Sequence, residues 1–277
     1  MPELPEVETI RRDLEKEVVS RKIKTVEVHG LRSIRRHTNK KQFIARLEDR
    51  KIDAVGRRGK NLLLSVGDDY LVVHLGMSGQ LLRAAPKDPT AKHTHVVFTF
   101  TQGGQLRYVD PRTFGELYVV SKAGLAEEAP ELAELGFDPV EDAVSWDLFG
   151  ARLIARRVKL KTLLMDQRFV AGIGNIYSDE ILWNAGLRPD RGSETVSTQE
   201  VRRLYRSMGE VLQEAIKLRG SSLADEQYRD LYGKVGNYQA EHKVYGREGQ
   251  PCRRCRHTVQ RMKWASRSSF FCPGCQV

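Results

Sequence analysis

The pattern of hydrophobic and polar positions divides the chain into a strand-rich first part and a helical second part. Short apolar or alternating runs separated by turns occur as KTVEVHG, NLLLSVG, YLVVHLGM, HVVFTFT, QLRYVD and GELYVV. Runs of this length and spacing predict a β-sandwich or barrel. We expect a helix beginning near Val7 to precede these strands.

From about Trp146 the apolar positions follow a helical period, in DLFGARLIARRV, LKTLLMDQ, NIYSDEILWNAG and TQEVRRLYRSMGEVLQEAIKLRG. Near the C-terminus, TVQRMKWASRSSFFC predicts two short strands around a turn near Ala265 to Ser268. The sequence therefore predicts a multidomain α+β protein with a β part, a helical part and a terminal hairpin, in that order.

Length and composition narrow the class of protein. The chain has 277 residues, more than one average domain, and 40% of them are hydrophobic, which is enough for a packed core. No apolar run approaches membrane-spanning length, and the first twenty residues lack the apolar segment of a signal peptide. We therefore expect a cytoplasmic protein that has no membrane partner.

The distribution of charge indicates a polyanionic partner. The formal net charge is +10, and residues 21–60 contain fourteen Lys or Arg against four acids. Residues 240–277 form a second basic concentration, whereas residues 123–147 contain eight acids and no base. We expect the acidic stretch to connect two domains and to face away from the polyanion.

All four cysteines lie in the second basic region, as CRRC and CPGC with sixteen residues between the pairs. This spacing is typical of a two-knuckle zinc site, and the expected absence of secretion argues against two disulfides. Four thiolates leave a zinc ion no open position for catalysis, so we predict one structural Zn²⁺. Its ligands are Cys252, Cys255, Cys272 and Cys275.

The opening residues MPELPEVET allow two interpretations. Pro2 and Pro5 can simply hold the terminus extended, because proline suppresses an early helix. Alternatively, removal of Met1 makes Pro2 the N-terminus and gives it a free secondary amine, which is a nucleophile. A free α-amino group has a pKa of about 7.7 to 8.0, so a useful fraction is unprotonated at neutral pH.

The segment VAGIGNIYSDE places Gly172, Gly174 and Asn175 just before a predicted helix. Backbone N–H groups at a helix N-terminus and a side-chain amide beside them suit a phosphate. Asn is also a preferred N-cap, and from the residues alone the cap is the favoured interpretation.

The motifs PELPEVET, RRGKN, HLGMSG, DPRTFGE and GIGNIYSDE, followed by the two-knuckle hairpin, occur in the order found in one family. Over nearly its whole length the chain resembles bacterial formamidopyrimidine-DNA glycosylase, which excises oxidised purines such as 8-oxoguanine. The resemblance implies an N-terminal β-sandwich with flanking helices, a helix-two-turn-helix domain and a zinc-finger hairpin. We place these domains at residues 1–131, 132–236 and 237–277.

The resemblance also implies the catalytic residues. Pro2 matches the nucleophile that forms a Schiff base with the sugar, Glu3 the adjoining acid/base and Glu6 a positioning carboxylate. Lys60 matches the lysine of β-elimination and phosphate contact, and Arg267 the finger arginine that binds phosphate and assists δ-elimination. Without the resemblance, either cation would be an ordinary surface residue of a basic protein.

DNA contacts follow from the same match, at His93, Arg112, Asn175 and one of Arg156 and Arg157, for which we choose Arg156. An enzyme that extrudes a base must fill the space left behind. Met77, Arg112 and Phe114 match the family's void-filling residues, with Phe114 as the wedge. Taken alone, Met77 and Phe114 would be core residues of a hairpin.

Three positions depart from the family pattern. Thr113 stands where a second arginine is common, Asn61 where an aromatic residue is common, and Arg219 where glycine is frequent. Residues 219–238 should form the loop that covers the flipped base, and this divergence leaves the residues that read the base unassigned.

Two alternatives remain open: a zinc-ribbon DNA-binding protein without enzymatic activity, and an oxidised-pyrimidine glycosylase of the endonuclease VIII type. PELPEVET together with the complete void-filling set favours the purine enzyme. We expect a monomer that acts on double-stranded DNA containing oxidised bases.

Overall fold

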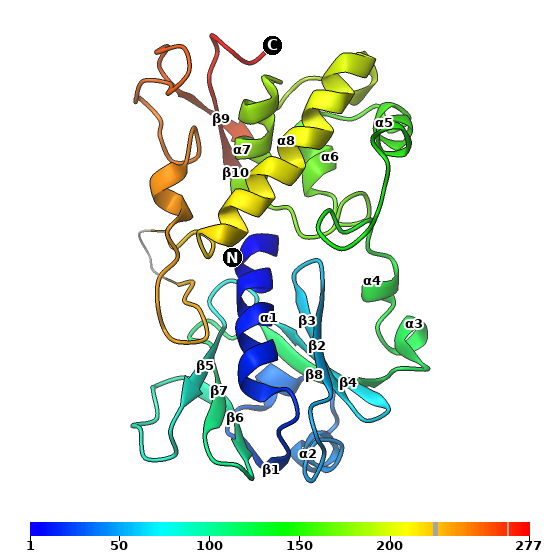
Figure 1. Ribbon diagram of the computed structural model, residues 1–277, viewed down its shortest axis with the longest axis vertical. Helices are drawn as coiled ribbons and strands as arrows, with labels where there is room; N and C mark the ends of the chain where they lie inside the picture. The colour runs from blue at the N-terminus through cyan, green and yellow to red at the C-terminus, as the bar shows by residue number, and fades with distance from the viewer. Residues whose placement is uncertain (224–226, 265) are drawn as a thin grey trace. The chain divides into compact units, whose positions relative to one another are not determined.

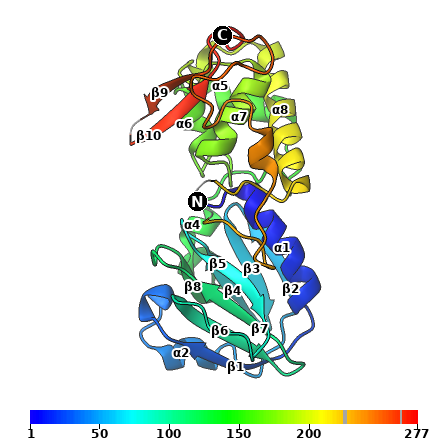
Figure 2. The same cartoon turned by 90° about the vertical axis from the view of Figure 1, so that its left-hand side faces the viewer.

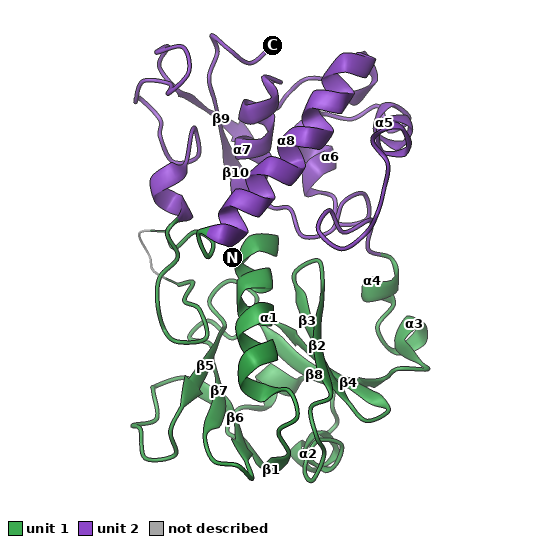
Figure 3. Ribbon diagram, in the orientation of Figure 1, with its two compact units in different colours: residues 1–134, 218–237 green, residues 135–217, 238–277 purple. Residues whose placement is uncertain are grey.

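The computed structural model describes residues 1–223, 227–264 and 266–277. The chain forms two compact units, of which unit 1 contains residues 1–134 and 218–237, and unit 2 contains residues 135–217 and 238–277 (Figure 3). The passage from unit 1 to unit 2 at residues 134–135 falls within the acidic stretch. Among the described residues, no helix is both long enough and apolar enough to cross a membrane.

Unit 1 is built on two antiparallel sheets of four strands each (Figure 1). The first has the order β1-β6-β7-β5, with β1 at Ile23–Val28, β6 at Thr94–Phe100, β7 at Gln105–Val109 and β5 at Gln80–Ala84. The second has the order β2-β3-β4-β8, with β2 at Ala54–Arg58, β3 at Asn61–Val66, β4 at Asp69–His74 and β8 at Glu116–Ser121. Two separate sheets make this a sandwich, which confirms one of the two predicted architectures.

The core of unit 1 lies between these sheets and helix α1 (Leu4–Val18). Leu64 from one sheet, Phe98 from the other, and Val7 and Ile10 from α1 belong to one buried cluster. Burying each such side chain contributes about 1.5 to 3 kcal/mol. Short helices flank the sheets: η1 (Leu31–Ile34), α2 (Lys40–Ala45), α3 (Leu125–Glu128) and α4 (Pro130–Ala133).

Helix α1 begins at Leu4, so the predicted start near Val7 is wrong by three residues. Pro5 lies in the first turn, where a helix does not use the backbone N–H that proline lacks. The Glu6 carboxylate accepts a hydrogen bond of 2.8 Å from the N–H of Glu3, the residue that precedes the helix. Proline is therefore compatible with an early helix here.

Unit 2 contains the four predicted helices: α5 (Trp146–Ile154), α6 (Leu160–Met165), α7 (Asn175–Ala185) and α8 (Thr198–Lys217). The buried positions of α8 recur every three or four residues, as Val201, Leu204, Met208 and Val211 do, and α8 packs on α7. Two 3₁₀ turns complete the unit, η2 (Ser193–Thr195) and η3 (Tyr238–Glu241).

The predicted terminal hairpin is present as β9 (Gln260–Trp264) and β10 (Arg267–Phe271), and Figure 2 shows it beside α7. The predicted turn near Ala265 to Ser268 is wrong in part, because Arg267 and Ser268 already pair with Trp264 and Lys263 in the two strands. Ala265 lies outside the described residues.

Residues 218–237 belong to unit 1 although they follow α8. The Ser221 N–H donates a 2.7 Å hydrogen bond to Glu6, and the Arg219 guanidinium pairs with Asp13 and Asp230. The three domain boundaries expected from the sequence stay a prediction.

Candidate functional site

The start of the chain is held by buried carboxylates. Pro2 is buried directly before Glu3, and the side chains of Glu3 and Glu6 are also buried. Glu6 accepts hydrogen bonds from the Glu3 N–H at 2.8 Å and the Ser221 N–H at 2.7 Å. Gly220 has a φ of +76°, and a Cβ there would lie 2.6 Å from Glu6 Oε1. Glu6 therefore fixes the backbone that carries Pro2.

Arg219, which departs from the family pattern, adopts the left-handed backbone that favours glycine, with a φ of 63°. Its Nε donates to Asp230 at 3.0 Å, and its guanidinium also pairs with Asp13. Burial acts to lower the pKa of Arg219, but these two carboxylates outweigh it and raise the pKa above its usual value. Ion pairs thus stabilise an arginine in a conformation that usually selects glycine. The segment it begins includes residues 224–226, which lie outside the described residues.

Lys60 lies in the tight β2–β3 turn, beside Gly59 with a φ of 56°. The Lys60 side chain is mostly buried. Two residues before Gly59, the buried Arg57 pairs with the buried Glu8 of α1 at 3.1 Å. This ion pair anchors the β2–β3 turn, which carries Lys60, to helix α1.

His74, at the end of β4, neighbours the Lys60 turn. Its Nδ1 lies 3.1 Å from Asn61 Oδ1. Asn61, where the family commonly has an aromatic residue, therefore contacts His74 on the neighbouring strand, a structural role that the sequence did not reveal. Burial lowers the pKa of His74, and the cations of Lys60 and Arg35 lower it further against the opposing charge of Glu116. The imidazole is therefore neutral at neutral pH.

Met77 and Phe114 are exposed at the tips of two turns in unit 1, with 40% and 45% of their surface accessible. Arg112 is also exposed, and its Cζ lies 4.8 Å from the centroid of the Phe114 ring. The core interpretation that the residues alone favoured is therefore wrong for both apolar side chains. His93 is exposed just before β6, and its carbonyl accepts a 3.0 Å hydrogen bond from the Asp110 N–H.

Two cations of the basic N-terminal stretch are engaged within unit 1. Arg35 pairs with Glu116 at 3.0 Å, and Arg36 pairs with Glu116 at 2.7 Å and with Glu131 at 2.6 Å. The Arg36 guanidinium also stacks over Tyr118, 3.7 Å from the ring centroid. These contacts thus neutralise part of the positive charge of residues 21–60.

The N-cap of α7 is Gly174, so the prediction that Asn175 is the N-cap is wrong. Asn175 is the first helical residue, and its Oδ1 is buried without a hydrogen-bond partner within the described part of the chain. Arg156 and Arg157 are both exposed after α5, and Arg267 is exposed at the start of β10. The structure places these four residues in unit 2.

The four cysteines converge on one point at the base of the hairpin. Their sulfur atoms all lie within 4.8 Å of one another, with Cys252–Cys275 at 3.8 Å and Cys255–Cys272 at 3.3 Å. Zn–S bonds of about 2.3 Å in a tetrahedron place sulfur atoms about 3.8 Å apart, so the cluster fits one zinc ion. The Trp183 Nε1–H donates to Cys252 Sγ at 3.3 Å and ties the site to α7.

Two buried acids of α7 hold the C-terminal segments, and the sequence interpretation missed both. Asp179 pairs with Lys161 at 2.6 Å and accepts hydrogen bonds from the Ser269 hydroxyl at 2.7 Å and the Phe270 N–H at 2.9 Å. Glu180 accepts hydrogen bonds from three consecutive N–H groups of residues 243–245. Two adjacent acids directly before the apolar run Ile181–Trp183 were the available signal.

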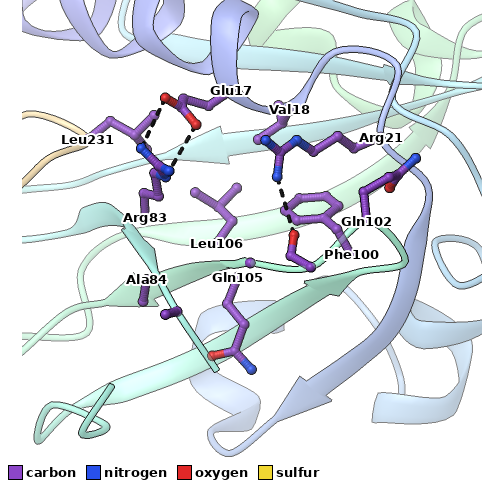
Figure 4. Close-up of a pocket in the computed structure, with 13 residues that line it drawn as sticks. Glu17, Val18, Arg21, Arg83, Ala84, Phe100, Gln102, Gln105, Leu106 and Leu231 are labelled. Atoms are coloured by element: carbon purple, nitrogen blue, oxygen red, sulfur yellow. Dashed lines mark hydrogen bonds and ion pairs between the residues drawn. The ribbon is translucent and has the colours of Figure 1, made fainter. Parts of the chain in front are cut away.

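A pocket of about 370 Å³ lies in unit 1 between the end of α1, β5 and the β6–β7 turn (Figure 4). Arg83 pairs there with Glu17 at 3.3 Å, and Arg21 donates to the Gly103 carbonyl at 3.2 Å. Its described lining contains none of the predicted site residues. Because none of the predicted catalytic residues is among the described residues that line it, we do not place the reaction there.

Family models match three successive parts of the chain. They are described as the formamidopyrimidine-DNA glycosylase N-terminal domain (residues 1–117), the formamidopyrimidine-DNA glycosylase H2TH domain (135–227) and a zinc finger found in FPG and IleRS (249–277). The formamidopyrimidine-DNA glycosylase of Pelotomaculum thermopropionicum is 43% identical over 277 residues, covering 100% of this chain and 99% of that protein.

Solved structures agree over the same length. The Lactococcus lactis Fpg in complex with DNA containing an abasic site has a TM-score of 0.90 and 37% identity, covering 99% of both chains. MutM in complex with DNA containing carbocyclic 8-oxo-G has a TM-score of 0.89 and 37% identity, again covering 99% of both chains.

The sandwich with its buried N-terminal carboxylates and the helical unit with its zinc centre define a zinc-finger protein of the helix-two-turn-helix class. The chain belongs to the formamidopyrimidine-DNA glycosylase family. Both alternatives, the pyrimidine enzyme and the non-enzymatic zinc ribbon, are disfavoured by these matches.

Proposed function

We propose that this chain is a base-excision-repair DNA glycosylase that removes oxidised purines, 8-oxoguanine and formamidopyrimidines, from duplex DNA and then cleaves the strand by β,δ-elimination. The observation that carries the proposal is the match of the whole chain to this family, with Pro2 followed directly by the buried pair Glu3 and Glu6. The solved relatives that hold abasic or 8-oxo-G DNA support the same substrate class.

In the proposed first step, the Pro2 nitrogen attacks C1′ of the damaged nucleotide and the bond from C1′ to the base breaks. The base leaves with the bonding electron pair and takes up a proton. Glu3, adjoining Pro2, is the proposed acid/base of this exchange. The Pro2 nitrogen then loses its proton, and the C1′–O4′ bond breaks while O4′ takes up a proton, which leaves a positively charged iminium between Pro2 and C1′. The iminium draws electrons toward itself, so a proton is lost from C2′ and the 3′ phosphate, and then the 5′ phosphate, is eliminated.

Glu6 supports this step without touching DNA. Its hydrogen bonds to Glu3 and Ser221 fix the backbone next to Pro2, so the amine has one position before the substrate arrives. A fixed nucleophile avoids the entropy cost of ordering it in the transition state.

The remaining proposed roles concern DNA. Lys60 and Arg267 contact phosphate and assist β- and δ-elimination, respectively, whereas His93, Asn175 and Arg156 contact the DNA. Among the described residues, the buried amide oxygen of Asn175 has no hydrogen-bond partner, so beside the α7 N-terminus it marks a polar position to which a ligand can bring one. The zinc ion holds the hairpin that presents Arg267 and has no part in the chemistry.

The test is a borohydride trap with duplexes that carry either 8-oxoguanine or an oxidised pyrimidine. Borohydride reduces the iminium to a stable amine, so intact-mass analysis should show a protein–DNA adduct on a chain that begins at Pro2. We expect the 8-oxoguanine duplex to give the faster adduct.

Pro5→Ala is the matched control, because Pro5 lies in the first turn of α1 and leaves the terminal amine unchanged. It should still form the adduct, whereas a chain extended before Pro2 should form none. Full activity on protein that retains Met1 would refute the Pro2 mechanism, and a faster adduct with the pyrimidine duplex would refute the substrate class.

A further inference from the structure

Asp110, at the end of β7, is a fully buried carboxylate on which four donors converge. Its Oδ1 accepts from the Ser78 hydroxyl at 2.6 Å and the Arg112 N–H at 3.2 Å, and its Oδ2 accepts from the Tyr108 hydroxyl at 3.0 Å and the Gly115 N–H at 2.9 Å. Burial acts to raise the pKa of Asp110, but these hydrogen bonds outweigh it and lower the pKa. The carboxylate is therefore ionised at neutral pH, and each of its two oxygens accepts two hydrogen bonds.

The four donors come from two turns and from β7, the strand that ends directly before Asp110. Ser78 belongs to the turn of residues 75–79, between β4 and β5, which carries Met77 at its tip. The Arg112 and Gly115 N–H groups belong to the turn of residues 110–115, between β7 and β8, which carries Phe114. The buried side chain of Asp110, the first residue of the second turn, thus accepts hydrogen bonds from both turns that present the proposed void-filling residues.

The backbones of the two turns also touch. A Cβ on Gly76 would lie 2.5 Å from the Gly115 nitrogen, and a Cβ on Gly115 would lie 2.6 Å from the His74 carbonyl oxygen. The same Cβ on Gly115 would lie 2.1 Å from the Tyr108 hydroxyl. Separations this short leave no room for a side chain, so the glycines allow the turns to pack directly against each other.

We propose that Asp110 is a positioning residue that joins the two turns into one rigid body, so that Met77, Arg112 and Phe114 enter the DNA at a fixed spacing. This inference rests on the proposed function, in which the three side chains fill the space left by one extruded base. Exposed side chains have little packing of their own, so their spacing is set by the backbones that carry them. Because those backbones are ordered before DNA binds, the binding step does not include the entropy cost of ordering them.

The inference is tested with two mild substitutions and one matched control. Ser78→Ala removes the hydroxyl that links the Met77 turn to Asp110, and Tyr108→Phe removes the one that Asp110 accepts from β7. Tyr118→Phe is the control, since Tyr118 is equally buried in unit 1 and its hydroxyl donates to the Glu131 carboxylate at 3.1 Å. Asp110→Asn would place an amide N–H against donors, so the milder variants carry the test.

The first measurement is single-turnover excision of 8-oxoguanine from a duplex, beside borohydride trapping on a single strand with an abasic site, which requires no base extrusion. Ser78→Ala and Tyr108→Phe should each slow duplex excision about tenfold, or about 1.4 kcal/mol. Their trapping on the single strand, and both reactions of Tyr118→Phe, should stay within about twofold of wild type.

The second measurement is amide hydrogen exchange in the free protein, which does not depend on any activity. Because the Gly115 N–H donates to Asp110, Ser78→Ala in one turn should speed exchange at Gly115 in the other turn. The Arg112 N–H donates both to Asp110 and directly to the Ser78 hydroxyl, at 3.3 Å, so the coupling is measured at Gly115. Tyr118→Phe should leave exchange there unchanged.

Each result assigns the failure to one idea. If wild type excises no oxidised purine, the proposed function fails, while the exchange experiment still tests the coupling of the turns. If wild type is active and Ser78→Ala and Tyr108→Phe excise as fast as Tyr118→Phe, or if faster exchange stays within the mutated turn, the role of Asp110 is refuted.

Discussion

Replacing Asp179 by asparagine should detach the zinc hairpin from the helices of unit 2. Asp179 and Lys161 are both fully buried, 2.6 Å apart. The same carboxylate accepts the Ser269 hydroxyl and the Phe270 N–H of β10, the strand that begins with Arg267. Asp179→Asn keeps the size of the side chain but removes the negative charge that lies 2.6 Å from the buried Lys161 ammonium.

The size of the effect follows from this geometry. Removing one partner of a buried ion pair costs about 3 to 5 kcal/mol, because the remaining charge is uncompensated. Weakening the two hydrogen bonds from β10 adds to the loss, so we expect unfolding free energy to fall by at least about 4 kcal/mol. Asp190→Asn is the control, since Asp190 pairs with Arg188 at 3.0 Å with both side chains about one-third exposed. Its cost should stay below about 1 kcal/mol.

The assay is urea unfolding of the zinc-loaded protein followed by tryptophan fluorescence. All three tryptophans, Trp146, Trp183 and Trp264, belong to unit 2, so the signal reports on that unit. Lys161→Met completes a double-mutant cycle with Asp179→Asn. The double variant should be more stable than the sum of the single losses predicts, because each single variant loses the same Asp179–Lys161 attraction and the double variant loses it only once.

Three results would refute this reasoning. Asp179→Asn could cost less than about 1 kcal/mol, Asp190→Asn could cost as much as Asp179→Asn, or the two changes in the cycle could be additive. The first two would show that the buried pair adds nothing beyond a surface pair, and the third that the two charges do not interact.

Three further predictions concern the wedge, the metal and pH. Phe114→Ala should hardly change the melting temperature but should slow duplex excision, because its ring is 45% exposed; a stability loss of about 3 to 5 kcal/mol would instead show a core residue. Cys272→Ser or chelation should weaken DNA binding while the sandwich stays folded, and zinc-free active protein by elemental analysis would contradict this. Burial lowers the pKa of His242 to about 4. Between pH 6.5 and 4 the unfolded state therefore binds more protons than the folded state, and the free energy of unfolding decreases as the pH is lowered, by about 3 kcal/mol in total. His242→Phe should remove that loss of stability. If urea titrations give both proteins the same change of unfolding free energy with pH, His242 is not its cause.

The sequence by itself determined the elements whose signal is local. Strand alternation, the period of α8 and the spacing of Cys252, Cys255, Cys272 and Cys275 are carried by residues close together in the chain. They predicted the sandwich strands, the four helices of unit 2 and the zinc site, all of which the structure contains. Strands β2 (AVGRR) and β5 (QLLRA) were missed.

The tertiary structure alone decided which polar groups are buried and which apolar groups are exposed. Arg219 meets Asp13 across 206 positions, and Asp179 meets Ser269 across 90. Met77 and Phe114 are exposed because Gly76 and Gly115 bring two turns together with their tips in solvent. A buried charge or an exposed ring is stable only through partners or constraints supplied from elsewhere in the fold, and no local pattern records where those come from.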